Sequence, residues 1–191
     1  GQFPVISITL KDVLGDDFES AYLKLAEVVS AKANEFSFLK ESPYLNEMEK
    51  AKFDLLYDEV YLKRADDEAQ SYVTSAIKSL SLMLYKHFNK QVYILIDEYD
   101  VPLAKAQEHG YHKDMVTLMS SFLDFLKDPQ KDPEKDTSII SKVVITGCLK
   151  VAKNSLFTGV NNLYVNTVAD QEPQYTGIIG FTKDETQKIL K

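Results

Sequence analysis

Two adjacent acids follow an apolar run in the middle of the chain, and their types and spacing suit phosphate chemistry. Residues 92–96 (VYILI) lead directly into Asp97 and Glu98. Ligands of parallel sheets bind beyond the carboxyl ends of the strands, where an aspartate can hold Mg²⁺ directly or through a water. A neighbouring glutamate can orient or deprotonate a water that attacks a phosphate. This is the Walker B pattern, although a strand can also end in two acids because it reaches solvent.

Two further residues near these strand ends have competing interpretations. Asp100 either assists Asp97 on a metal ion or caps the turn before Pro102, and the cap is the favoured interpretation. Cys148, the only cysteine, is either a reactive thiol beside Lys150 or a small side chain that is at least half-buried. The second interpretation is favoured.

The elements that position these residues alternate between strands and helices. β-branched and apolar runs predict strands at residues 3–10, 92–96, 139–146 and 163–168. Apolar stripes predict helices from Asp16 to about Phe38, from Asn46 through Met48 to Val60, from Asp66 to Phe88, from Met115 to Leu126, and from Thr182 onward. Residues 127–138, with two prolines and mixed charges, predict an exposed loop. Strands separated by helices predict one α/β layer structure with a mainly parallel sheet. The strand at 92–96 is expected to be covered on both faces.

The composition excludes several classes of protein. The chain has 191 residues, 45% of them hydrophobic, which is ordinary for a globular domain and not for a disordered or fibrous chain. A net charge of −7 disfavours a broad nucleic-acid footprint. One cysteine cannot form an internal disulfide, so we expect a reducing, cytoplasmic setting. No apolar run approaches the ~20 residues of a membrane-spanning helix.

The segments 91–104 (QVYILIDEYDVPLA), 143–162 (VVITGCLKVAKNSLFTGVNN) and 180–185 (GFTKDE) resemble the predicted AAA-ATPase-like family, P-loop proteins common in gut bacteria and other anaerobes. The start, FPVISITLKDV, is similar to the part of such proteins between Walker A and Walker B. The resemblance implies that Asp97 is the Mg²⁺-associated acid and Glu98 the water-activating acid. It also implies that Thr146 is a polar sensor of the γ-phosphate. Lys150 stands where the family commonly has an arginine, and it keeps the charge but not the bidentate fork.

The resemblance also implies a fold. It is α/β and three-layered, with helices on both faces of a parallel sheet whose five strands follow the order 5-1-4-3-2. The strands predicted at 3–10, 92–96, 143–146 and 163–168 would be strands 2, 3, 4 and 5. The chain would then form one partial domain over residues 1–191, lacking strand 1, with a C-terminal lid beginning at about residue 180.

The main departure from the family is at the phosphate loop. The sequence contains no G-x-x-x-x-G-K-[ST] motif, which supplies backbone N–H groups and a lysine to the phosphates. We therefore expect an excised or truncated piece, with Gly1 as a cleavage scar, that alone binds Mg²⁺ and ATP weakly or not at all.

Three functions stay open at this point. The chain is the Walker B and sensor half of an ATPase, a degenerate P-loop scaffold that binds a protein or a nucleic acid, or a metal-dependent phosphohydrolase or nuclease that uses Asp97, Glu98 and Asp100. The vacant place of strand 1 beside residues 143–146 further predicts association of copies through an open sheet edge.

Overall fold

The computed structural model describes residues 3–127, 130–132, 135–148, 156–157, 160, 164 and 183–189. The chain divides into two compact units, residues 1–159 and 160–191. The first unit contains the sheet and the helices that pack on it. In the second unit the structure describes one helix, α9 (Lys183–Ile189), as predicted for the end of the chain. The strand predicted at 163–168 falls almost entirely outside the described residues.

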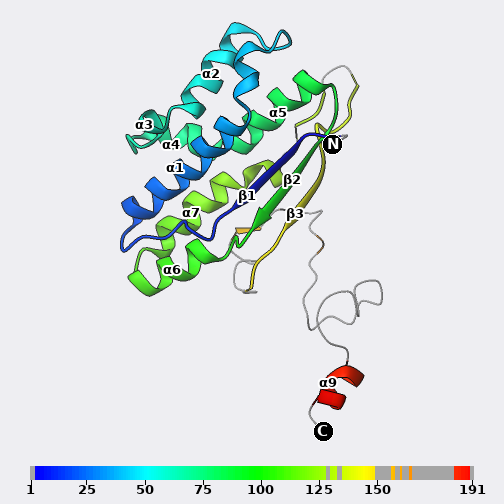
Figure 1. Ribbon diagram of the computed structural model, residues 1–191. Helices are drawn as coiled ribbons and strands as arrows, with labels where there is room; N and C mark the ends of the chain where they lie inside the picture. Colours follow the sequence, from blue (N-terminus) through cyan, green and yellow to red (C-terminus); the bar gives the residue numbers. More distant parts are fainter. Residues whose placement is uncertain are drawn as a thin grey trace. The chain divides into compact units, whose positions relative to one another are not determined.

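Three parallel strands lie side by side in the order β1-β2-β3 (Figure 1). Their bounds are β1 (Val5–Thr9), β2 (Val92–Asp97) and β3 (Ile140–Ile145). Val5 pairs with Tyr93, and Leu95 pairs with Val144. The strands predicted at 3–10, 92–96 and 139–146 are therefore confirmed, and so is the adjacency of the expected strands 2, 3 and 4.

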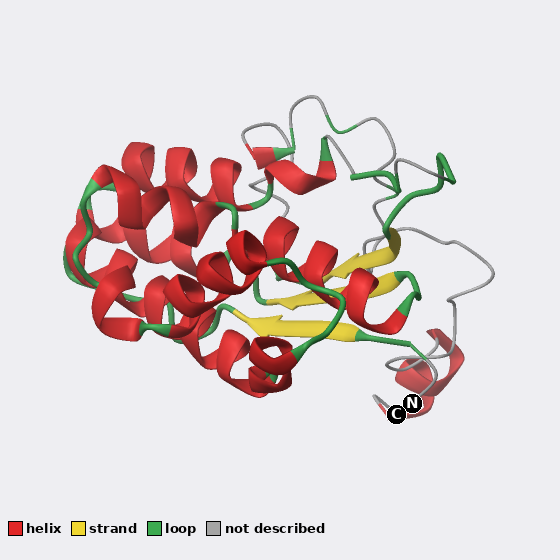
Figure 2. Cartoon of the chain, turned by 90° about the horizontal axis from the view of Figure 1, so that it is seen from above, coloured by secondary structure: helices red, strands yellow, loops and turns green. Residues whose placement is uncertain are grey.

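Helices fill both connections of the sheet, and Figure 2 shows them in red beside the yellow strands. Between β1 and β2 lie α1 (Phe18–Glu35), the 3₁₀ helix η1 (Ser37–Glu41), α2 (Glu47–Tyr57), α3 (Glu59–Leu62), α4 (Asp67–Thr74) and α5 (Ala76–Phe88). Between β2 and β3 lie α6 (Val101–His109), α7 (His112–Phe122) and the 3₁₀ helix η2 (Asp124–Leu126).

Local capping starts several of these helices. Asn46 and Glu49 form a reciprocal capping box at α2, and the Asp66 side chain accepts the Ala69 N–H at the start of α4. The predicted cap at Asp16 is wrong by one residue. The Asp17 side chain accepts the Ser20 N–H instead, at 2.8 Å. Each of these helix starts is thus fixed by a hydrogen bond between residues three positions apart in the sequence.

Four helix predictions need correction. The helix expected from Met115 to Leu126 runs from His112 to Phe122 and is followed by the 3₁₀ helix η2. The helix expected to reach about Phe38 ends at Glu35, and the one expected from Asp66 to Phe88 breaks at Ser75 into α4 and α5. Met48, in the first turn of α2, and Val60 are exposed rather than part of a buried stripe, and Val60 lies in α3 because Asp58 ends α2 and starts α3. Helix α6 was not predicted, although Pro102 near its start and Gly110 after its end are typical helix boundaries.

One face of the sheet is covered and the other is open within the described residues. Both connections step across the sheet in the same direction. Because such crossovers share one hand, their helices lie on the same face. Ile6, Ile94 and Ile96 point to that face and are at most 1% exposed. On the opposite face, Val5, Leu95 and Val144 are 40–43% exposed. The expectation of a β2 covered on both faces, and of three layers, is therefore not met in the described part, which has two layers.

The loop predicted at residues 127–138 is anchored at one buried acid. Asp132 is buried and accepts a hydrogen bond from the Tyr85 hydroxyl, while Lys135 lies 3.6 Å from the same carboxylate. Lys131 and Ser138 also form an isolated antiparallel bridge. In its described residues the loop is thus attached to α5 through Asp132 and Lys135.

Candidate functional site

Asp97 and Thr146 meet at the carboxyl ends of β2 and β3. The Thr146 N–H donates to the Ile96 carbonyl at 2.8 Å, which extends the strand pairing by one residue. The Thr146 hydroxyl donates a hydrogen bond to Oδ1 of Asp97. Both side chains are exposed. The structure therefore brings together two of the residues that the sequence singled out, and we call residues 97–100 and 146–148 the tip.

Glu98 has a strained backbone. Its φ of 56° lies in the left-handed region, which costs a residue with a Cβ about 1–2 kcal/mol. The turn is closed by the Val101 N–H, which donates to the Glu98 carbonyl at 3.2 Å. Strain of this kind concentrates at functional sites, where surrounding contacts hold an unfavourable conformation. The side chain of Glu98 is partly exposed next to Asp97.

Asp100 points into the tip and not to solvent. It is 3% exposed, and its Oδ2 accepts the backbone N–H of Cys148 at 3.0 Å. Although Asp100 stands at the N-cap position of α6, its side chain makes no capping hydrogen bond there. The favoured interpretation as a local cap is therefore wrong, because the carboxylate bonds to a backbone group on the neighbouring strand's loop.

Gly147 lets the two loops of the tip approach closely. A Cβ at this position would lie 2.5 Å from Oδ1 of Asp100 and 2.6 Å from Cε1 of Tyr99. The Tyr99 N–H also donates to the Thr146 carbonyl at 3.2 Å. The backbone at Gly147 thus rests directly on two residues of the Asp97–Asp100 loop, and no side chain fits between them.

Tyr99 forms the apolar backing of the tip. Burial raises the pKa of the Tyr99 hydroxyl, and the charge of Asp100 adds to the rise. The ring packs against Phe157 with centroids 5.4 Å apart. A neutral tyrosine therefore supports the buried carboxylate next to it.

The three acids of the tip do not form a metal centre together. Within the residues that the structure describes, no group of three or more histidine, cysteine, aspartate or glutamate side chains could hold a metal ion. Asp100 faces the backbone of Cys148, while Asp97 and Glu98 are the more exposed acids. Within the described residues, therefore, Asp97, Glu98 and Asp100 do not converge as the ligands of one metal ion, and a phosphohydrolase or nuclease site built from these three acids stays a prediction.

The other residues singled out from the sequence have different outcomes. Cys148 is exposed, so its interpretation as an at least half-buried side chain is wrong. Lys150 lies outside the described residues, and its role stays a prediction. Sequence reasoning also missed Tyr99 and Gly147. The contacts of both join segments nearly fifty residues apart, and no local pattern in the sequence indicates them.

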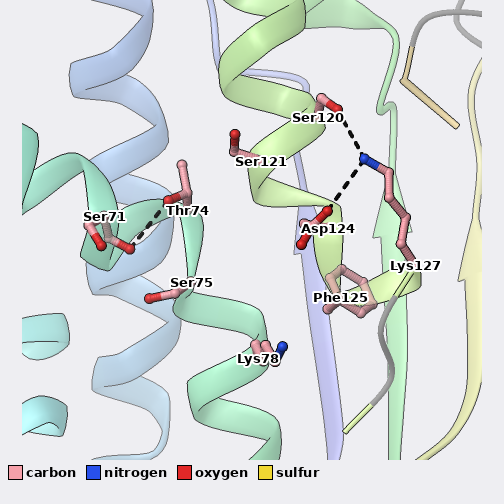
Figure 3. Close-up of a pocket in the computed structure, with 9 residues that line it drawn as sticks. All are labelled: Ser71, Thr74, Ser75, Lys78, Ser120, Ser121, Asp124, Phe125 and Lys127. Atoms are coloured by element: carbon pink, nitrogen blue, oxygen red, sulfur yellow. Dashed lines mark hydrogen bonds and ion pairs between the residues drawn. The ribbon is translucent and has the colours of Figure 1, made fainter. Parts of the chain in front are cut away.

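A separate cavity of about 450 Å³ lies between the α4–α5 junction and the end of α7 (Figure 3). Serine, threonine and lysine side chains line most of it. Lys127 Nζ lies 3.4 Å from Asp124 Oδ1 and 3.5 Å from Ser120 Oγ, so its charge is already paired. None of the lining residues belongs to the tip, and the cavity therefore contributes nothing to this site.

No helix in the described part of the chain has both the length and the apolar character needed to cross a bilayer.

Comparisons with known proteins identify the family. No curated protein matches the chain, and no solved structure matches it either. The family model described as "Predicted AAA-ATPase" matches residues 1–157, which include all three strands and both loops of the tip. Because the match spans most of the sequence, the chain belongs to this AAA-ATPase-like family.

Proposed function

We propose that this chain is the Walker B and sensor part of a protein that binds and hydrolyses ATP. The observation that carries the proposal is the pairing of Asp97 with Thr146, an exposed acid and a hydroxyl at the adjacent ends of two parallel strands. Ligands of parallel sheets bind at such ends. Membership of the family supports ATP and Mg²⁺ as the ligands.

The residues of the tip fit Mg²⁺ through Asp97. A carboxylate has about four lone-pair sites, so the bond from Thr146 leaves acceptor capacity on Asp97 for a cation or its water shell. A bound Mg²⁺ would neutralise charge on the phosphates. Glu98, one residue further on, would orient the attacking water and take its proton. Thr146 would lie beside the terminal phosphate with its hydroxyl proton donated to Asp97, and Lys150 would add positive charge nearby.

The sequence contains no phosphate-loop motif, and this sets the first experiment. Without the backbone N–H nest and the lysine of that motif, the 191-residue chain should bind Mg-ATP weakly or not at all. Isothermal titration of the chain with Mg-ATP measures this directly. Micromolar affinity would show that another part of the chain binds the phosphates.

The second experiment tests the roles of the acids in a longer protein in which a phosphate loop accompanies this chain. Glu98→Gln should keep Mg-ATP binding and lower turnover by about 10²-fold or more, because the water loses its general base. Glu19→Gln, at an exposed position in the first turn of α1, is the matched control. Unchanged turnover in Glu98→Gln would remove Glu98 from this role.

Asp97→Asn tests the proposed metal ligand separately from the proposed general base, Glu98. The substitution should weaken the Mg²⁺ dependence of binding or turnover, since an amide oxygen is a poorer ligand for a hard cation than a carboxylate. Titration of Mg²⁺ at fixed ATP gives the measurement. An unaltered Mg²⁺ requirement would contradict the assignment of Asp97 to the metal.

The alternative function is a scaffold that binds a protein or a nucleic acid without hydrolysis. Such a scaffold would not need the phosphate-loop motif, which this sequence does not contain. A longer protein that neither binds nor hydrolyses ATP would select this alternative. Association through the edge of β3, the last strand in the described sheet, is a separate prediction. Light scattering over a concentration series tests it, and a constant monomer mass would contradict it.

A further inference from the structure

The tip contains a third acid besides Asp97 and Glu98, and its carboxylate is buried. Asp100 lies three residues beyond Asp97, is 3% exposed, and accepts the Cys148 N–H at 3.0 Å. Hydrogen bonds from backbone N–H groups to a carboxylate are stronger than those between neutral groups. A buried aspartate directed at the loop of the next strand is therefore suited to holding that loop in one place.

Besides the bond from the Thr146 hydroxyl to Asp97, three hydrogen bonds of backbone groups attach the segment 146–148 to β2 and the loop that follows it. The Thr146 N–H donates to Ile96, the Thr146 carbonyl accepts from Tyr99, and the Cys148 N–H donates to Asp100. The first two bonds fix the backbone at the strand end. The third fixes the far side of Gly147, beyond the point where regular strand pairing stops.

Because Gly147 is closely packed, the segment 146–148 fits against the Asp97–Asp100 loop in one position. The space that a Cβ would need is already filled by Asp100 and Tyr99. The segment 146–148 therefore has its backbone bonded on both sides of a residue that rests on the Asp97–Asp100 loop. A small movement of Asp100 would release the Cys148 end of the segment and leave Thr146 held only by its own bonds to Ile96, Tyr99 and Asp97.

We propose that Asp100 is a positioning residue that holds the 146–148 segment so that the Thr146 hydroxyl stays on Asp97. Its catalytic consequence rests on the proposed ATPase function, whereas the contact itself does not. Asp100 touches neither the nucleotide nor the metal in this proposal. Asp100 holds the backbone N–H of Cys148. Through this backbone it positions the side chain of Thr146, which lies two residues earlier and bonds to Asp97.

The single cysteine gives a direct test on the 191-residue chain. A sample labelled with ¹⁵N-cysteine shows one backbone amide signal, and this signal reports the N–H that Asp100 accepts. With ¹³C-labelled aspartate added, we expect a through-hydrogen-bond coupling between the Cys148 nitrogen and a side-chain carboxyl carbon. Absence of this coupling in the folded wild-type chain would overturn the proposal without any substitution.

Substitutions then measure how strongly Asp100 holds the segment. In Asp100→Ala we expect the Cys148 amide to exchange with solvent about tenfold faster or more, because a bond to a charged group is lost. Asp100→Asn, which keeps one acceptor oxygen, should give a smaller increase. Asp114→Asn, at an exposed position on α7, is the matched control and should leave the exchange rate unchanged. Unchanged exchange in a folded Asp100→Ala chain would contradict the proposal.

Turnover of a longer, ATP-hydrolysing protein tests the catalytic consequence. Asp100→Ala should lower kcat about tenfold with KM for ATP within about twofold of wild type, and Asp100→Asn should recover part of the loss. Thr146→Val should lower kcat similarly, and the double variant should show no further loss, because both act through one hydroxyl. Additive losses, or a rise in KM alone, would contradict the positioning role. A wild-type protein that does not hydrolyse ATP would instead contradict the proposed function, while the amide signal still decides the contact.

Discussion

The helix starts of the helical layer and the loops of the tip satisfy their polar groups in opposite ways. In the helical layer, side chains such as Asp17, Asn46 and Asp66 accept N–H groups three residues away. In the tip, Thr146 and Cys148 bond to side chains 48 or 49 residues away. The tip also contains Glu98 in a strained conformation. The first region can form from local sequence, whereas the second exists only after β2 and β3 have paired, so the two regions should respond differently to substitution.

The largest expected difference in stability is between substitutions on the two faces of β2. One face packs against the helices, and the other is open within the described residues. Ile94 is fully buried and Leu95 is 40% exposed. Ile94→Ala should lower the free energy of unfolding by about 2–5 kcal/mol through lost burial and a cavity. Leu95→Ala should cost less than about 1 kcal/mol. Urea titration measures both. Equal losses would show that the face bearing Leu95 is also covered.

The next effect tests the close approach inside the tip. Gly147→Ala places a methyl group 2.5 Å from Asp100 and should lower the free energy of unfolding by about 1–3 kcal/mol. At Gly110, nothing lies within 4 Å of the added Cβ, but φ is +84°. Gly110→Ala should therefore cost about 1–2 kcal/mol through backbone strain alone, and Gly110→Asn less. A Gly147→Ala chain as stable as wild type would mean that the two loops are not in contact.

A pH experiment examines a buried group in the helical layer. The Tyr22 hydroxyl donates to the Leu62 carbonyl at 2.9 Å, and burial, more than the nearby Asp66 and Tyr61, raises its pKa to about 12 from 10.0. The pKa of Tyr22 is higher in the folded than in the unfolded state. The contribution of Tyr22 to the free energy of unfolding is therefore complete below pH 10 and is lost as the pH rises toward 12.

Tyr22→Phe should remove that part of the pH dependence. It should also cost about 1 kcal/mol at neutral pH, because the Leu62 carbonyl loses its donor. Thermal unfolding at several pH values between 8 and 12 provides the measurement. A Tyr22→Phe chain that loses stability over this range as steeply as wild type would assign the effect to other groups.

The smallest effect is a gain in stability. Glu98→Gly should raise the free energy of unfolding by up to about 1 kcal/mol, because glycine adopts φ of 56° without strain but has more freedom when unfolded. Glu98→Ala keeps the Cβ and should leave stability nearly unchanged. Denaturant titration of both variants tests whether the tip stores strain, and a destabilised Glu98→Gly chain would contradict it.

Elements governed by near neighbours were predictable from the sequence. The capping box at Asn46 and Glu49, the acidic start at Asp66 and the apolar strand at 92–96 each lie within a few residues of sequence. The Asp97–Glu98 pair at the end of that strand was recognisable for the same reason, while its chemistry stays a proposal. The break at Ser75 and the start of α6 were not predictable from the sequence, since tertiary packing decides where adjacent helical turns separate.

The arrangement of the tip was only partly predictable. The order of the strands placed Asp97 and Thr146 at adjacent strand ends, as the structure has them. The direction of the Asp100 side chain depends on the loop after β3, so the local interpretation of Asp100 as a cap was wrong. The apolar run of β2 predicted burial on both faces, whereas within the described residues Leu95 is 40% exposed.

The pairing of Val5 with Tyr93 has a consequence for synthesis on the ribosome. The segment between them forms α1 to α5, whose contacts are closer in sequence and can form while translation continues. β1 must wait unpaired until β2 has been made, a delay of roughly ten seconds at typical elongation rates. During that interval the residues Val5–Thr9 (VISIT) are an unpaired β-prone segment of the nascent chain. Their exposure ends only when the last residues of β2 have been made and the two strands pair.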